Sequence, residues 1–180
     1  MNTSDFDFNL PNSLIAQMPS EKRGDSRMLV INRKNSSISH YYIKDLTNFL
    51  NSDDIIVFND TKVIPARLFG NKKTGGKIEI LLLNEIKKNE WNVLIKSSRK
   101  PKINEELILC DGIVSARIVE YKDNGCVLIK ISCNENFFDI INIKGHLPLP
   151  PYIKRDYLNK DVLEIDNKRY QTIFANKLGA

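Results

Sequence analysis

Ile55-Ile-Val-Phe-Asn-Asp-Thr-Lys-Val-Ile-Pro-Ala-Arg-Leu-Phe-Gly70 is the stretch that decides the expected fold. Its first four residues form a short apolar run of the kind that is buried on both faces of a sheet. Asn59, Asp60 and Thr61 follow this run, and such residues turn the chain and offer hydrogen bonds. Open α/β sheets bind ligands at the edge where their strands end. We therefore predict a buried strand over residues 55–58 that presents polar groups at a ligand site.

The second half of this stretch is conformationally restricted. Pro65 fixes its own backbone and favours an extended conformation at Ile64. Arg67 thus leaves a constrained segment, and its guanidinium can offer a fork of donors to a carboxylate or phosphate. The plain alternative is an ordinary strand-to-loop exit, in which a side chain caps its own backbone.

This stretch resembles the signature of the S-adenosylmethionine:tRNA ribosyltransferase-isomerases, the enzymes of queuosine biosynthesis. Further motifs occur in the order found in that family: Asp5-Phe-Asp-Phe8, Leu10-Pro11, Leu14-Ile-Ala-Gln17, Pro19, Ser26-Arg27, Gly75-Gly-Lys-Ile-Glu79, Gly145-His-Leu-Pro-Leu-Pro-Pro-Tyr-Ile153, Arg155 and Tyr170-Gln-Thr172. Together they span the chain. Family members continue well past Ala180, so the sequence resembles an amino-terminal half.

Composition is typical of a folded globular chain, with 42% hydrophobic and 27% charged residues. No apolar run approaches the roughly 20 residues of a membrane helix, and the start lacks the basic and apolar regions of a signal peptide. The three cysteines have no Cys-x-x-Cys spacing and indicate little beyond a reducing compartment. We therefore expect a cytoplasmic protein without a membrane segment. The net charge of +5 permits contact with an RNA backbone without demanding it.

Strand-like runs at short intervals dominate the middle of the chain and predict a small antiparallel barrel or sandwich. They cover residues 77–83, 91–96, 106–110, 113–121 and 126–131. The other expected elements are a helical turn near 14–18, a hairpin of 27–32 with 37–42, and helices over 43–50 and 137–143.

The expected fold class is an incomplete α/β (α+β) host domain interrupted by an inserted small antiparallel β-barrel. Residues 1–69 form the first part of the host, residues 70–144 form the barrel-like insertion, and residues 145–180 return to the truncated host. The resemblance implies the same arrangement.

The family's reaction moves the ribosyl part of S-adenosylmethionine onto the 7-aminomethyl-7-deazaguanine of a tRNA. It gives epoxyqueuosine-tRNA and releases adenine and methionine. The resemblance thus implies S-adenosylmethionine as co-substrate, that tRNA as partner, no metal, and a monomer in the family's complete form. Because the sulfonium acidifies the adjacent 5′ carbon, the site needs a base, groups that tolerate a cation, and hydrogen-bond donors.

His146 and Tyr152 are the catalytic candidates. Both lie in the proline-rich block, which the prolines hold extended. His146 titrates near neutrality and can act as acid or base. Tyr152 can face the sulfonium through its ring or donate its hydroxyl. A rigid connector with aromatic packing is the alternative for this block.

The remaining candidates bind substrate or RNA. The substrate-binding candidates are Asn59, Thr61, Arg67, Gly76, Lys77 and Glu79. The glycines lack the spacing of a phosphate-binding loop, so a plain β-turn is the alternative there. The RNA-binding candidates are Arg99, Lys100, Lys102 and Arg155. Such cations can track phosphates without reading sequence, although charge runs are also often only solvated.

Two other functions stay open at this point. One is a non-catalytic RNA-binding module that works through the β insertion, although aromatic residues in its strands are few. The other is an inactive fragment, because an α/β sheet without its later strands has an open edge and uncovered apolar faces.

Overall fold

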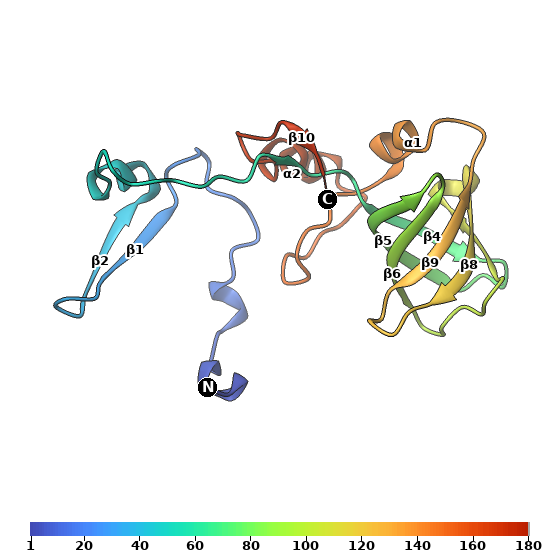
Figure 1. The fold of residues 1–180 in the computed structure, drawn as a ribbon, viewed down its shortest axis with the longest axis horizontal. Helices are drawn as coiled ribbons and strands as arrows, with labels where there is room; N and C mark the ends of the chain where they lie inside the picture. The colour runs from blue at the N-terminus through green and yellow to red at the C-terminus, as the bar shows by residue number, and fades with distance from the viewer. Residues whose placement is uncertain (180) are drawn as a thin grey trace. The chain divides into compact units, whose positions relative to one another are not determined.

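The computed structural model describes residues 1–179. The chain divides into two compact units, one of residues 1–58 with 151–155 and one of residues 59–150 with 156 onward. Helices and an antiparallel β-barrel occur together (Figure 1). The predicted α+β class with a small barrel is therefore confirmed. Among the described residues no helix is long and apolar enough to cross a membrane.

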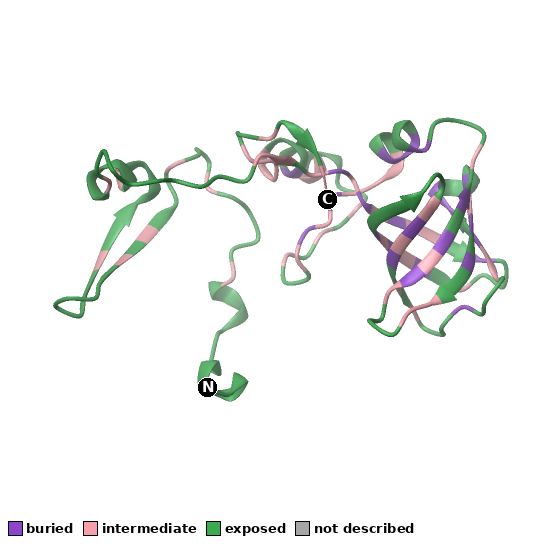
Figure 2. Ribbon diagram, in the orientation of Figure 1, coloured by how far each residue is buried: buried purple, intermediate pink, exposed green. Residues whose placement is uncertain are grey.

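The first unit contains one hairpin and three short 3₁₀ helices. Strand β1 (Arg27–Asn32) pairs with β2 (Ser37–Tyr42) as predicted. The 3₁₀ helices are η1 (Thr3–Phe6), η2 (Asn12–Leu14) and η3 (Ile43–Phe49). The helix predicted over 43–50 is thus a 3₁₀ helix, and near 14–18 only Leu14 is helical, as the last residue of η2. Short segments that cannot propagate an α-helix often take the 3₁₀ form. None of residues 1–58 is buried (Figure 2).

The prediction of a buried strand over residues 55–58 is wrong. These residues form no strand, and Ile55 and Val57 are 91% and 89% exposed. An apolar run becomes a buried strand only where neighbouring strands bond to it and another layer covers it. In the described part of this unit the only sheet is the β1–β2 hairpin. Regular pairing begins later, where β3 (Thr61–Lys62) runs parallel to β10 (Lys177–Leu178).

A closed six-stranded barrel forms the body of the second unit. The strands are β4 (Arg67–Lys72), β5 (Lys77–Lys87), β6 (Glu90–Ser97), β7 (Glu106–Leu109), β8 (Val114–Tyr121) and β9 (Val127–Ser132), in the order β4-β5-β6-β9-β8-β7. Buried residues alternate with more exposed ones along its strands (Figure 2). The buried side chains form its core, which includes Leu68, Ile80, Val93, Leu107, Ile118 and Ile129. All five predicted strands are present.

The sixth strand, β4, was not predicted, because its last residues, Asn71 and Lys72, are polar. Gly70 allows β4 to close the barrel against β7. A Cβ at this position would overlap the carbonyl oxygen of Ile108 and lie 2.8 Å from the Cα of Leu109. Backbones can approach this closely only where there is no side chain.

Helix α1 (Phe137–Lys144) lies at one end of the barrel, as Figure 1 shows. Asn136 caps its first turn, and Phe137 packs on Trp91 with ring centroids 5.8 Å apart. The chain then passes the proline-rich block and forms α2 (Lys160–Arg169), which the sequence reading did not predict. A last 3₁₀ turn, η4 (Cys110–Gly112), joins β7 to β8.

Candidate functional site

Two motifs that are far apart in the sequence meet at the start of the barrel. The backbone N–H of Arg67 donates to the carbonyl of His146 at 3.0 Å, and the N–H of His146 donates to the carbonyl of Arg67 at 2.9 Å. This antiparallel bridge places the first residue of β4 beside the first residues of the proline-rich block. A catalytic candidate and a substrate-binding candidate are therefore neighbours.

The guanidinium of Arg67 is engaged by three groups of the protein. Its Nη1 donates to the hydroxyl of Tyr157 at 2.7 Å, and its Nη2 donates to the carbonyl of Leu149 at 2.9 Å. Its Nε lies 3.2 Å from a carboxylate oxygen of Glu79, whose other oxygen is 3.9 Å from Nζ of Lys96. Each guanidinium nitrogen of Arg67 thus already has a protein partner, so the group fixes the positions of its neighbours rather than waiting for an anion.

His146 lies in an aromatic cluster with Phe69 and Tyr157. Its ring centroid is 4.7 Å from that of Tyr157 and 5.2 Å from that of Phe69, and the latter two rings are 4.8 Å apart. Burial, and then the positive charge of Arg67, lower the pKa of His146 below its ordinary value of 6.5. The imidazole is therefore neutral at pH 7, which is the form that can accept a proton.

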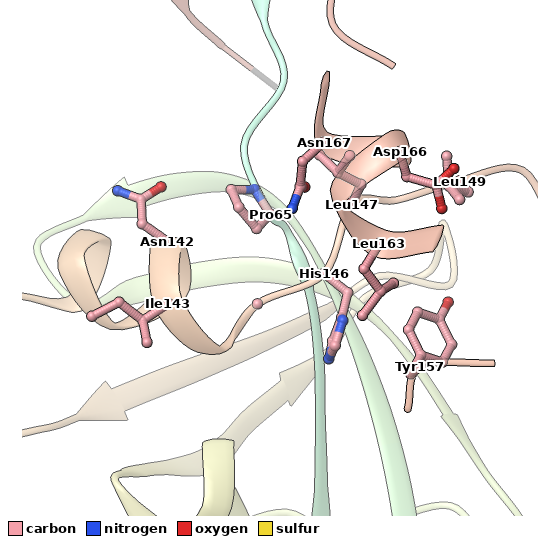
Figure 3. Close-up of a pocket in the computed structure, with 11 residues that line it drawn as sticks. Pro65, Asn142, Ile143, His146, Leu147, Leu149, Tyr157, Leu163, Asp166 and Asn167 are labelled. Carbon is pink, nitrogen blue, oxygen red and sulfur yellow. The ribbon is translucent and has the colours of Figure 1, made fainter. Parts of the chain in front are cut away.

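A cavity of about 160 Å³ adjoins this cluster. Figure 3 shows the side chains of His146 and Tyr157 next to each other in its wall. Helix α2 contributes Leu163, Asp166 and Asn167 to the lining. The cavity is small for a nucleoside but offers both apolar and polar groups beside a neutral imidazole.

Asn59 and Thr61 lie in the segment that leads to β4, and neither lines this cavity. The Oδ1 of Asn59 accepts a hydrogen bond from the N–H of Thr61 at 2.8 Å, which is the plain alternative of a side chain capping its own backbone. The side-chain amide of Gln171 bonds to both backbone groups of Val63, accepting from its N–H at 2.9 Å. Gln171 therefore anchors this segment, a role that sequence reasoning did not identify.

Gly76 and Lys77 lie at the β4–β5 turn. The N–H of Gly75 donates to the carbonyl of Lys72 at 2.9 Å, as in a plain β-turn, and the carbonyl of Gly76 accepts from the N–H of Lys72 at 2.9 Å. Lys77 begins β5, and its exposed side chain lines a second cavity together with Phe69 and Tyr157. Tyr157 lines both cavities.

Tyr152 and Arg155 belong to the first unit. Tyr152 is 57% exposed, and its carbonyl accepts a hydrogen bond from Nε2 of Gln17 at 3.0 Å. The Oε1 of Gln17 in turn accepts from the N–H of Lys154 at 2.8 Å. Gln17 thus ties residues 152–154 to the amino-terminal segment within this unit, while the role of Tyr152 stays a prediction.

The predicted RNA-binding cations Arg99, Lys100 and Lys102 are exposed in the loop between β6 and β7. Nζ of Lys100 lies 3.7 Å from the ring centroid of Tyr121, a cation–π contact. The backbone of Arg99 accepts hydrogen bonds from Lys72 Nζ and from Ser97 Oγ. The loop backbone is therefore anchored while its cationic side chains face solvent.

Sequence reasoning missed the aromatic partners of His146. The alternation of β4, which turns Arg67 and Phe69 to the same face, would have identified Phe69. Tyr157 follows a proline-rich block and precedes a helix, and no local pattern marks it. Among the described residues no cluster of three or more His, Cys, Asp or Glu side chains is placed to hold a metal ion.

Comparison with known proteins identifies the family. The model of the family described as queuosine biosynthesis protein matches residues 3–180. S-adenosylmethionine:tRNA ribosyltransferase-isomerases of Desulforamulus reducens and Carboxydothermus hydrogenoformans are 41% and 42% identical to the chain over its whole length. The chain spans about half the length of these relatives, 51% in each case.

A solved structure of the S-adenosylmethionine tRNA ribosyltransferase of Thermotoga maritima is 35% identical. The matched region covers 79% of this chain and 49% of the Thermotoga maritima chain, with a TM-score of 0.39. The family match and the relatives confirm the resemblance first seen in the motifs. The chain belongs to the queuosine biosynthesis protein family.

Proposed function

We propose that the chain is the amino-terminal part of an S-adenosylmethionine:tRNA ribosyltransferase-isomerase. The reaction transfers the ribosyl moiety of S-adenosylmethionine to the 7-aminomethyl-7-deazaguanine of tRNA and isomerises it, and adenine and methionine leave. The observation that carries this proposal is the pairing of Arg67 with His146 beside a cavity in a member of this family.

In this proposal His146 removes the proton from the 5′ carbon next to the sulfonium. Its neutral imidazole suits that task because a base must be unprotonated at working pH. Arg67 positions the catalytic segment through its bonds to Tyr157 and Leu149. The ring of Tyr152 is proposed to face the cationic sulfur.

The other candidates keep their proposed roles. Asn59, Thr61, Gly76, Lys77 and Glu79 bind substrate, and Arg99, Lys100, Lys102 and Arg155 contact RNA phosphates. We further propose a cytoplasmic protein that is monomeric in its complete form, takes S-adenosylmethionine as co-substrate and needs no metal. Residues 1–69 and 145–180 belong to a host domain, and residues 70–144 are its β-barrel insertion.

A chimaera tests the proposal. The chain replaces the aligned half of the Desulforamulus reducens relative, and adenine release is measured by chromatography with S-adenosylmethionine and substrate tRNA. We expect release by the chimaera and a loss of about 100-fold or more in His146→Gln, the usual effect of removing a general base. His40→Gln is the matched control, because His40 is the chain's other histidine and lies exposed in β2. A folded chimaera that binds tRNA but releases no adenine would overturn the proposal.

We expect the 180-residue chain to be inactive by itself, because no side chain in residues 1–58 is buried. A segment without a core cannot hold catalytic groups in fixed positions. Adenine release by the purified chain alone would contradict this expectation.

A further inference from the structure

A groove of about 560 Å³ on the outer face of the barrel is a second hollow beside the His146 cavity, and Tyr157 lines both. Strands β4, β5 and β7 form its floor. Their registers place Asn71 opposite Lys77 on one side and opposite Ile108 on the other, so these three side chains form a row across the sheet. Phe69 and Tyr157 line the groove next to this row.

The aromatic side of the groove suits a planar ring. Phe69 and Tyr157 are half-buried and meet edge to face with centroids 4.8 Å apart, and Ile108 is 40% exposed at the opposite edge. Nucleobases of any sequence stack on such side chains, because every base has a π-face. The amide of Asn71 is exposed and can donate to and accept from the edge of a base.

The charges of the groove suit a phosphate. Lys77 is exposed, and no ion-pair partner for its ammonium is found in residues 1–179. Asp111, the acidic residue of the lining, is already paired with Lys144 at 2.8 Å. One unpaired positive charge therefore remains beside the aromatic rings.

The rim of the groove is a strained turn. Cys110, Asp111 and Gly112 have φ values of 52°, 58° and 93°, so two residues other than glycine are left-handed in succession. Such conformations cost energy and persist only where the surroundings enforce them. Asp111 of this turn pairs with Lys144 of α1 at 2.8 Å.

We propose that this groove binds one unpaired nucleotide of an RNA, with its base against Phe69 and Tyr157 and its phosphate on Lys77. The identity of that RNA as the substrate tRNA rests on the proposed function. The adenosine of S-adenosylmethionine is the other source of a nucleobase. It has no phosphate, and its sulfonium and ammonium outweigh its carboxylate, so it is a net cation and the charge of Lys77 favours RNA over it.

Fluorescence anisotropy with the 180-residue chain tests the proposal. The probes are a labelled RNA hairpin with a single-stranded loop and a fully paired RNA duplex of the same length. We expect Phe69→Leu to weaken hairpin binding about fivefold or more, the effect of losing one stacked base. Lys77→Ala should weaken it and reduce the slope of log K against log salt by about one. The matched controls are Lys130→Ala, an exposed lysine of β9, and Phe138→Leu, an aromatic residue of α1 that lines other cavities.

The proposal stands if only the two groove variants weaken hairpin binding, duplex binding is unchanged, and saturating S-adenosylmethionine does not displace the hairpin. It is overturned if the hairpin does not bind, if the controls weaken binding equally, or if S-adenosylmethionine competes. Thermal melts identify a variant that fails to fold. In that case ultraviolet crosslinking of the unaltered chain decides, because the crosslinked peptide must contain Phe69 or Tyr157.

Failure of this inference differs from failure of the proposed function. RNA binding that depends on Phe69 and Lys77, without adenine release by the chimaera, would overturn the enzymatic proposal alone. If the chimaera releases adenine but the hairpin binds both variants as tightly as the parent chain, only the proposal of the groove as a nucleotide site would be overturned.

Discussion

Gly145→Ala tests the contact between α1 and the segment that enters the barrel. Gly145 ends α1, and its N–H donates to the carbonyl of Ile141 at 2.8 Å. Its φ of −77° is open to any residue, so the substitution has no backbone strain of its own. A Cβ there would nevertheless overlap the carbonyl oxygen of Pro65 and lie 2.5 Å from that of Ile141. Both obstacles are backbone, so α1 and the Pro65 segment must separate.

The expected loss of stability follows from two opposing effects. Forcing a methyl group into a packed site costs about 1–3 kcal/mol. Replacing glycine by alanine otherwise stabilises by about 0.4–1 kcal/mol, because it restricts the unfolded chain. The net destabilisation is about 1–2 kcal/mol, which lowers Tm by about 2–8 °C for a chain of this size.

Urea unfolding followed by tryptophan fluorescence measures this loss. Trp91 is the chain's single tryptophan, is 4% exposed, and contacts Phe137 and Phe138 of α1 at centroid distances of 5.8 and 5.9 Å. It therefore reports on the junction that the substitution disturbs. Gly76→Ala is the control, since a Cβ there meets only Lys72 Cδ at 3.7 Å. Equal stability of the two variants would refute the reasoning.

Three further predictions concern the site and the first unit. Arg67→Met should lower the free energy of unfolding by about 2–3 kcal/mol, since it removes charged hydrogen bonds to Tyr157 and Leu149; urea unfolding unchanged from the parent would contradict this. His146 should titrate below 6.5 by NMR, because burial and the charge of Arg67 lower its pKa. The free energy of unfolding that is linked to this shift is fully present above pH 6.5 and is lost as the pH falls through the pKa of His146 in the folded protein. In His146→Gln the free energy of unfolding should therefore fall less steeply between pH 6.5 and that pKa. Amides of residues 1–58 should exchange hydrogen far faster than those of β8, because that segment has no buried side chain; slow exchange at residues 55–58 would show that the strand forms after all.

Local patterns predicted five of the six barrel strands well because buried and exposed residues alternate along them. Trp91 and Val93 point inward in β6, as do Val127 and Ile129 in β9, and the barrel encloses both pairs. The same method misread residues 55–58, because an apolar run carries no information on whether neighbouring strands exist to cover it. It also missed β4, whose last residues are polar and become a strand only through pairing with β5 and β7.

The sequence by itself determined the family, the alternation of the barrel strands, and the proposal of Arg67 and His146 as site residues. Only the tertiary structure showed that these two residues are bonded neighbours, since a barrel that closes on itself returns the chain to the point where it began. Only the tertiary structure added Phe69 and Tyr157 to their surroundings and turned the guanidinium of Arg67 towards protein groups. Contacts between residues distant in sequence depend on register and closure, and no local pattern of residues specifies them.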